Sequence, residues 1–281
     1  MTLTLGTAPF GQRPAGVFNF ERGGPAHVLY FEASPRRVRG ILAGETVLDS
    51  RRVKLLHETG HLPVWYFPEE DVRMDLLERT DRSTHCPFKG DASYWSVRVG
   101  DRVAENATWG YPHPMDGAPP IAGHLAFYWE SLDRWLEEDE EVAIHPRDPY
   151  HRVDVLETSR HVRVSLEGEV LAESRRSHVL FETGLSPRYY LPAEDVRTDA
   201  LEPAELITGC PYKGEATYWS MRTSSGSEDF LAWTYEEPRR EIAPVAGLVC
   251  FFNERVDLEV DGELQERPKT PWSSSDWART T

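Results

Sequence analysis

The sequence predicts a mainly β protein built from two tandem copies of one compact domain. Residues 86–96 read Cys-Pro-Phe-Lys-Gly-Asp-Ala-Ser-Tyr-Trp-Ser and recur as residues 210–220, Cys-Pro-Tyr-Lys-Gly-Glu-Ala-Thr-Tyr-Trp-Ser, at an offset of 210 − 86 = 124. The same offset relates Trp109 to Trp233. Within each copy apolar and polar residues alternate, which is the period of a strand with one buried face. A chain of 281 residues is long enough for two such domains.

The repeat and the local composition divide the chain into five segments. They are an irregular N-terminal arm at 1–27, a first β domain at 28–137, an acidic and proline-containing linker at 138–149, a second β domain at 150–266 and a flexible tail at 267–281. The arm is rich in Gly, Pro and Arg and has no counterpart between the copies. Acidic runs broken by proline are typical of linkers. The tail is expected to be loose or to pack only through Trp272 and Trp277.

The strands follow from the alternation, taken in chain order. A tight hairpin is predicted over residues 37–48, and its repeat over 161–171 has Glu-Gly at the turn. Further strands are predicted at 53–58, 64–67, 94–99, 107–111 and 124–129, each with a partner 124 residues later. Only 69–77 and 193–201 suggest a helical turn, because proline there precedes acidic residues suited to a helix N-terminus.

The composition favours an acidic, cytoplasmic protein. Lys and Arg number 31 against 47 Asp and Glu, a net charge of −16 that opposes binding to a phosphate backbone. Three cysteines cannot form a disulfide framework and suit reduced thiols. No stretch approaches the roughly 20 apolar residues of a membrane span, and the N-terminus lacks the features of a signal peptide. We therefore expect neither nucleic acid nor a membrane as partner, and the oligomeric state stays open.

The Cys-Pro-aromatic-Lys-Gly segment places a nucleophile and a cation in one turn. Proline presets the backbone at the second turn position and glycine permits the exit, which would bring Cys86 close to Lys89 and Cys210 close to Lys213. A nearby ammonium favours the thiolate, so the cysteine is a candidate nucleophile. Two alternatives stay open: the lysines could clamp an anion beside a merely buried cysteine, or the segment could be a buried thiol beside a solvated lysine.

Glu58 and Glu182 each end a strand-like run and are followed by Thr-Gly. By alternation Glu58 shares a face with apolar neighbours, so it would need a partner or a raised pKa. Arginines stand nearby in sequence at 51–52 and 175–176, and Arg51 and Arg175 are therefore candidate ligand-binding residues. The glutamates could act as general acid or base or anchor a ligand; a structural ion pair is the alternative.

Eight aromatic residues retained in both copies could line a pocket in each. They are Tyr94, Trp95, Trp109 and Tyr111 with Tyr218, Trp219, Trp233 and Tyr235. Core packing is the alternative interpretation, because neighbouring residues of a strand face opposite ways and only part of the set can face one cavity.

No metal or cofactor is expected. The pairs Asp71 with Asp75 and Asp195 with Asp199 could hold a divalent ion, but helix capping and surface ion pairs are the commoner outcomes. Five histidines of the first copy have no histidine 124 residues later, namely His57, His61, His85, His113 and His124. A His-Cys metal site unique to that copy is conceivable, whereas the chain has no Cys-x-x-Cys pair for structural zinc.

The order of these motifs resembles the domain-of-unknown-function 427 family. The motifs are Asp-Ser-Arg-Arg (49–52), Glu-Thr-Gly (58–60), Tyr-Phe-Pro (66–68), Asp-Val-Arg (71–73), Cys-Pro-Phe-Lys-Gly (86–90), Tyr-Trp-Ser (94–96), Trp-Gly-Tyr-Pro (109–112) and Ile-Ala-Gly (121–123), and most recur in the second copy. The resemblance implies a compact β-tent fold, shared with methionine sulfoxide reductase B and the cereblon ligand-binding domain. Many of those relatives bind zinc through paired cysteines, which this chain lacks. The family's classification also implies nucleotidyltransferase activity, but the Gly-Ser turn followed by an Asp-x-Asp pair is missing.

The leading hypothesis is that each copy binds a small polar or anionic ligand of unknown identity in an aromatic-lined cleft. Lys89 and Lys213 would fix the anion, the paired glutamates would accept a hydrogen bond, and the cysteines would lie at the wall. The alternatives are a cysteine-dependent enzyme, a nucleotidyltransferase and a non-catalytic interaction module. Whether the protein is an enzyme stays open.

Overall fold

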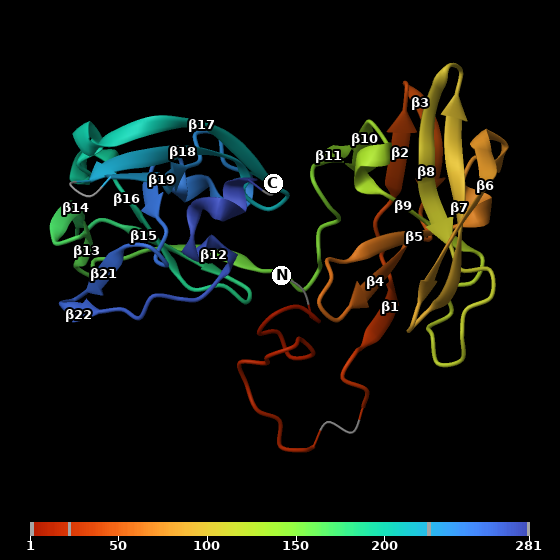
Figure 1. Ribbon diagram of the computed structural model, residues 1–281, viewed down its shortest axis with the longest axis horizontal. Helices are drawn as coiled ribbons and strands as arrows, with labels where there is room; N and C mark the ends of the chain where they lie inside the picture. The colour runs from red at the N-terminus through yellow and green to blue at the C-terminus, as the bar shows by residue number, and fades with distance from the viewer. Residues whose placement is uncertain (1–2, 22–23, 224–225, 280–281) are drawn as a thin grey trace. The chain divides into compact units, whose positions relative to one another are not determined.

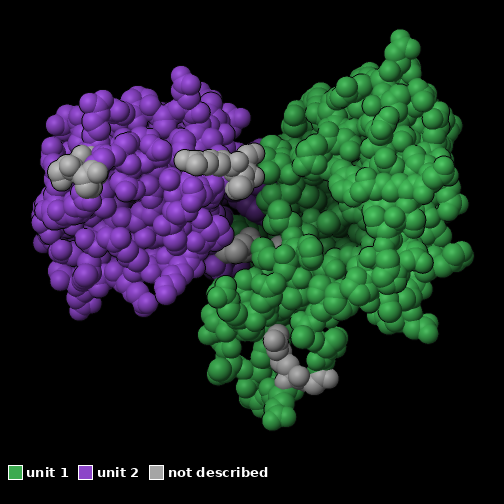
Figure 2. All heavy atoms as spheres, viewed as in Figure 1, with its two compact units in different colours: residues 1–151 green, residues 152–281 purple. Residues whose placement is uncertain are grey.

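The computed structural model describes residues 3–21, 24–223 and 226–279. It divides into two compact units, residues 1–151 and 152–281 (Figure 2). Each unit contains one seven-stranded and one four-stranded sheet. The predicted fold class, two copies of a mainly β domain, is confirmed. Residues 1–2 and 22–23 of the predicted arm and 280–281 of the predicted tail lie outside the described residues.

The first unit has the sheet orders β1-β4-β5-β9-β8-β7-β6 and β11-β10-β2-β3. Its strands are β1 Leu29–Ala33, β2 Val38–Leu42, β3 Glu45–Ser50, β4 Lys54–Glu58, β5 Val64–Pro68, β6 Leu77–Cys86, β7 Gly90–Val99, β8 Arg102–Gly110, β9 His124–Phe127, β10 Arg134–Glu137 and β11 Glu140–Val142. Figure 1 shows β7 and β8 lying side by side in this unit, and they pair antiparallel.

The second unit repeats both sheets, in the orders β12-β15-β16-β20-β19-β18-β17 and β14-β13-β21-β22 (Figure 1). Its strands are β12 Val153–Glu157, β13 Val162–Leu166, β14 Glu169–Ser174, β15 His178–Glu182, β16 Arg188–Leu191, β17 Leu201–Cys210, β18 Gly214–Thr223, β19 Gly226–Thr234, β20 Val249–Phe251, β21 Asp257–Val260 and β22 Glu263–Leu264. The two units therefore share one topology, with β1 corresponding to β12 and so on along the chain.

The offset between the copies changes near the end of each unit. In the four-stranded sheets Arg134 pairs with Ile41, whereas Asp257 pairs with Ser165. The first-named residues differ by 257 − 134 = 123 and their partners by 165 − 41 = 124. The second copy is thus one residue shorter between the last strand of its large sheet and the strand that follows.

Each seven-stranded sheet is buried on both faces, because neighbouring residues of its inner strands enter different cores. Leu55 and Trp65 belong to a core shared with the four-stranded sheet. Leu56 and Tyr66, their immediate neighbours, belong to a second core with Tyr94 and the loop before β9. Alternating side chains of a strand point to opposite faces, so a run of apolar residues fills both cores. The second unit has the same two cores.

The predicted hairpins and inner strands are present, but the helical turns differ and several strands were not predicted. The segment 69–77 forms two short 3-10 turns, η1 Glu69–Asp71 and η2 Met74–Leu76, in place of one helical turn. Between them Val72 is extended and bridges to Leu48 of β3. The second unit matches with η4 Ala193–Asp195 and η5 Thr198–Ala200. The strands that were not predicted are β1, β6, β10 and β11, with β12, β17, β21 and β22 in the second unit. Few residues of β6 and β17 are buried, and their apolar alternation is weak.

The segments outside the repeats also contact the units. β11 lies within the stretch predicted as a linker and pairs with β10. In the predicted arm, the buried hydroxyl of Thr4 donates to the carbonyl of Glu58 at 3.0 Å. The predicted tail forms η7 Pro271–Ser273 and η8 Ser275–Arg279. Its two tryptophans, Trp272 and Trp277, pack against the second core of their unit.

Candidate functional site

The Cys-Pro-aromatic-Lys-Gly segment forms the predicted turn, and it joins β6 to β7. The amide of Lys89 donates to the carbonyl of Cys86 at 3.3 Å, and Cys86 faces Gly90 across the hairpin. Gly90 has φ +99°, and a Cβ there would lie 3.2 Å from the amide nitrogen of Met115. Glycine is required at this position both for its backbone conformation and for space.

The second unit builds the same turn between β17 and β18. Lys213 donates from its amide to Cys210 at 3.3 Å, and Gly214 has φ +98°. A Cβ at Gly214 would meet the carbonyl oxygen of Glu237 at 3.3 Å. Cysteine and lysine are therefore brought to one bend in both copies, as the sequence predicts.

Each lysine of these turns is ion-paired with the glutamate that ends the neighbouring inner strand. The ammonium of Lys89 donates to Glu58, and Lys213 lies 2.5 Å from Oε2 of Glu182. The side chains of the pair in the first unit are only 10% and 12% exposed. The nearby arginines at positions 51 and 52 are thus not the partners of Glu58 that sequence proximity suggested.

Burial and ion pairing shift the pKa values of Glu58 and Lys213 in opposite directions. Burial raises the pKa of Glu58, but the hydrogen bond and charge of Lys89 outweigh it, and the net pKa lies below its ordinary value. Burial lowers the pKa of Lys213, while Tyr235 and Glu182 raise it, and the net pKa lies above its ordinary value. In each unit the charge of the partner therefore favours the ionised form, that of Glu58 in the first unit and that of Lys213 in the second.

Sequence reasoning missed His27, which it left in the irregular arm. Nε2 of His27 lies 3.0 Å from Oε1 of Glu58, and its ring stacks on Phe88 with centroids 3.7 Å apart. Its counterpart is His151, since 151 − 27 = 124. The presence of a histidine at the same position of both copies is the sequence signal that could have identified His27. The first site thus combines a thiol, an ammonium, a carboxylate and an imidazole.

The eight predicted aromatic residues do not converge on one cleft. Tyr94 and Tyr111 are buried in the core beside Lys89, whose ammonium lies 6.0 Å from the Tyr111 ring. Trp95, next to Tyr94 on β7, packs against the opposite core. Trp109 hydrogen-bonds the Tyr66 hydroxyl. The prediction that strand alternation splits the set is confirmed.

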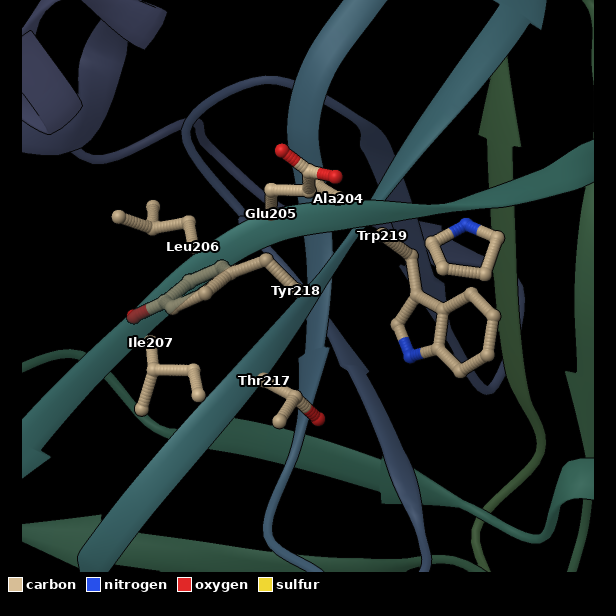
Figure 3. A pocket seen from close by; sticks show the side chains of 8 residues that line it. Ala204, Glu205, Leu206, Ile207, Thr217, Tyr218 and Trp219 are labelled. Carbon is tan, nitrogen blue, oxygen red and sulfur yellow. The ribbon is translucent and has the colours of Figure 1, made fainter.

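The second unit divides its aromatic residues in the same way. Figure 3 shows Tyr218 and Trp219 leaving β18 on opposite sides, beside a cavity of about 670 Å³ at the bulge of β17. Tyr218 and Tyr235 belong to the core beside Lys213, and the indole of Trp233 donates to Tyr190 at 3.1 Å. These side chains mainly fill the core next to the turn that carries Lys213.

The predicted Asp-x-Arg-x-Asp motifs bind cations of the protein itself. Asp71 accepts from Ser50 at 2.7 Å and from Arg52 at 2.6 Å, and both partners lower its pKa, Arg52 the more strongly. The second unit repeats this with Asp195, which accepts from Ser174 at 2.6 Å and Arg176 at 2.7 Å. The two aspartates of each motif lie in separate 3-10 turns and share no helical face. Ion pairing with arginines of the protein, the alternative to a divalent ion, accounts for them.

The histidines unique to the first copy are dispersed. His57 contacts Glu32 at 2.9 Å, His85 contacts Asp91 at 2.6 Å, and His124 contacts a backbone carbonyl. His61 and His113 lie in the loops after β4 and β8. Among the described residues no group of three or more His, Cys, Asp or Glu side chains is arranged to hold a metal ion.

Arg51 and Arg175 line a groove that occurs at the same place in both units. In the first unit it measures about 600 Å³ and includes Arg51, Arg52, Lys54 and Glu70. In the second it measures about 530 Å³ and includes Arg175, Arg176, His178 and Glu157. We call these the arginine grooves. They lie where the loop before β4 or β15 passes the end of the first strand of the sheet.

Within each groove one arginine is fixed and the other is open. Arg52 is held by Asp71, whereas Arg51 is exposed and makes no hydrogen bond or ion pair with any described residue. Arg176 is likewise held by Asp195, and Arg175 is exposed without such a partner in the described part of the chain. An open guanidinium beside a fixed one offers donors to a ligand.

Comparison with known proteins identifies the family. The chain matches the family described as a domain of unknown function, DUF427 (NTP_transf_9), over residues 30–138 and again over 154–262. No curated protein matches the chain significantly. Among the described residues no helix is long and apolar enough to cross a membrane. The chain therefore belongs to the DUF427 family and carries its domain twice.

Proposed function

We propose that each copy binds a small anionic ligand in its arginine groove, with Arg51 and Arg175 contacting the negative group. The observation that carries this proposal is the recurrence of the groove with an open arginine at the same repeat position. A guanidinium presents donors in a planar fork that matches a carboxylate or a phosphate. An exposed arginine retained only for solubility would not need the groove that recurs beside it.

The charge of the grooves supports an anionic ligand. The chain carries a net charge of −16, yet the first groove is lined by three cationic side chains and one carboxylate. The Lys54 ammonium is, after the Arg51 guanidinium, a second cationic group of this groove without an ion pair among the described residues. In the second groove the equivalent residue is His178, which lies 4.0 Å from Glu157. We therefore expect tighter binding in the first groove.

The lysines of the Cys-Pro-aromatic-Lys turns are poorer anion sites. Lys89 and Lys213 are compensated by Glu58 and Glu182 at short range. An anion bound there would have to compete with a carboxylate already in contact, at an unfavourable electrostatic cost. The ligand expected from the sequence, a small anion, is therefore retained. Its negative group would contact Arg51 or Arg175 and not the turn lysines.

Calorimetric titration with inorganic pyrophosphate at low ionic strength tests the proposal. We expect two binding events in the wild-type protein, one of which is weakened in Arg51→Ala and the other in Arg175→Ala. Each substitution should weaken its own site by about tenfold or more, because a charged hydrogen bond contributes about 1.5–3 kcal/mol.

The matched control is Arg102→Ala. Arg102 is exposed at the start of β8 and makes no ion pair with the described residues, but it lies outside both grooves. It should leave both binding events unchanged. If Arg51→Ala and Arg102→Ala weaken pyrophosphate binding equally, the groove has no special role and the proposal fails.

A further inference from the structure

The first unit contains an aromatic cavity of about 240 Å³ that is separate from the arginine groove. We call it the tryptophan cavity, and its lining includes Val64, Trp65, Trp109, Tyr128, Trp129 and Glu130. Trp135 also lines it, and the Trp129 and Trp135 rings are stacked with centroids 5.2 Å apart. Tyr128 at its edge is 38% exposed, so the cavity is open to solvent.

The second unit holds a guanidinium at the corresponding place. Arg188 stands 124 residues after Val64 and is buried against Glu254, with both nitrogens Nη1 and Nη2 donating at 2.7 and 2.6 Å. Its guanidinium carbon lies 5.6 Å from the Trp233 ring and 5.9 Å from the Phe252 ring. Trp272 of the tail covers it at 5.9 Å. A cation is thus enclosed by aromatic faces and neutralised by one carboxylate.

The two units share the aromatic and acidic part of this arrangement. The Trp233 and Phe252 rings lie 4.5 Å apart at 47°, and Trp109 and Tyr128 lie 4.6 Å apart at 44°. Glu130 corresponds to Glu254, since 254 − 130 = 124. The internal cation is missing from the first unit, because it has Val64 where the second has Arg188.

The corresponding carboxylate of the first unit, Glu130, lacks a cationic partner among the described residues. Glu130 is exposed and makes no ion pair with any residue in the described part of the chain, whereas Glu254 is fully paired. Additional tryptophan faces line the first cavity at positions where the second unit has other residues. Trp65 corresponds to Tyr189 and Trp129 to Asn253.

We propose that the tryptophan cavity of the first unit binds the guanidinium group of a small ligand, which takes the place that Arg188 occupies in the second unit. The group would stack on Trp109 and Tyr128 and pair with Glu130. A planar, weakly hydrated cation suits an aromatic wall and a carboxylate better than a compact ammonium does. This proposal does not depend on the anionic ligand of the arginine grooves.

The dimensions of the cavity favour a single small group. Sites for whole drug-sized molecules measure about 300–1,000 Å³, and the tryptophan cavity is smaller. It can enclose a guanidinium with a short alkyl stem while the rest of the ligand stays in solvent. The acidic character of the chain would attract such a cation over a longer range.

Titration with N-butylguanidinium, followed by tryptophan fluorescence and by NMR, tests the proposal. N-butylurea is the matched neutral probe, with the same planar shape and no charge. We expect saturable binding of the guanidinium compound and at least about tenfold weaker binding of the urea, because the carboxylate pairs only with the cation. Equal binding of both compounds would show a merely apolar cavity and overturn the proposal.

Two variants locate the site. Glu130→Gln should weaken N-butylguanidinium binding about tenfold or more, whereas Glu105→Gln should not, although Glu105 is also an exposed carboxylate of this unit without an ion pair among the described residues. Val64→Arg should abolish binding by supplying the internal guanidinium of the second unit. If Glu130→Gln and Glu105→Gln behave alike, or if Val64→Arg leaves the affinity unchanged, the proposal is wrong.

Discussion

The ammonium of Lys213 lies 2.5 Å from the carboxylate of Glu182, although the two residues are 31 positions apart in the chain. Lys89 and Glu58 form the same pair in the first unit. Each pair connects the end of an inner strand to the turn of the edge hairpin, which is formed by β6 and β7 in the first unit and by β17 and β18 in the second. The turn that carries the cysteine is thereby fixed by charge as well as by its backbone.

Breaking this pair from one side should strongly destabilise the second unit. Lys213→Met removes the ammonium that lies 2.5 Å from the buried Glu182 carboxylate and should lower the free energy of unfolding by about 3–5 kcal/mol. Lys213→Met combined with Glu182→Gln should cost clearly less than the sum of the two single changes. Urea denaturation followed by circular dichroism gives all three values. The exposed pair Arg98 and Glu78 is the control, and Arg98→Met should leave the unfolding midpoint nearly unchanged. Additive effects at Lys213 and Glu182 would contradict the coupling.

The stability of the first unit should depend on pH through Glu58. Its pKa in the folded protein lies below the ordinary value of 4.5. A group with a depressed folded pKa stabilises the protein above its unfolded pKa, and this contribution is lost as the pH falls through the folded pKa. Wild-type protein should therefore lose stability below about pH 4.5 more steeply than Glu58→Gln. Parallel acid-unfolding curves for the two proteins would show that Glu58 contributes nothing.

Two glycines with similar backbone angles should respond differently to alanine. Gly90 has φ +99° and no room for a Cβ, which would lie 3.2 Å from a backbone nitrogen, whereas Gly44 has φ +80° and open space. Gly44→Ala should cost about 1–2 kcal/mol from backbone strain alone. Gly90→Ala should cost more, because Met115 must also move. Thermal unfolding compares the two variants, and an equal cost would indicate that the hairpin shifts freely.

The three cysteines should differ in their reaction with a thiol reagent. Cys86 and Cys210 are partly exposed at their turns, and Cys250 is buried. Burial raises the pKa of Cys250 well above its ordinary value, which leaves little thiolate to react. Two thiols should react with dithionitrobenzoate in the folded protein and the third only after unfolding. The variants Cys86→Ser and Cys210→Ser should each remove one fast-reacting thiol, and reaction of all three thiols at one rate would contradict this prediction.

The duplicated motifs predicted the parts of the structure that depend on local chain geometry. The turn at Cys86, the hairpin of β2 and β3 and the alternation of Tyr94 with Trp95 all follow from neighbouring residues. The partner of Glu58 did not, because Lys89 reaches it only through the order of strands in the sheet. β6 was missed for a related reason, since an exposed edge strand needs no apolar face.

Positions that differ between the copies carry information that the retained residues do not. Arg188 has no arginine counterpart, and a comparison of retained residues passes over it. Its partner Glu254 is retained as Glu130, but a lone exposed glutamate gives no sequence signal. The exchange of Arg188 for Val64 is informative only together with the three-dimensional surroundings of Trp109 and Trp233.

The stacked rings of Trp129 and Trp135 form a spectroscopic pair that is not repeated at the corresponding positions of the second unit. Two indoles whose centroids are 5.2 Å apart couple their electronic transitions and produce a split circular dichroism band. In the second unit the corresponding positions carry Asn253 and, by the register of the four-stranded sheets, Leu258. The band therefore reports the folding of one half of a duplicated protein. It allows the unfolding of the two halves to be followed separately in the intact chain, without labels or truncation.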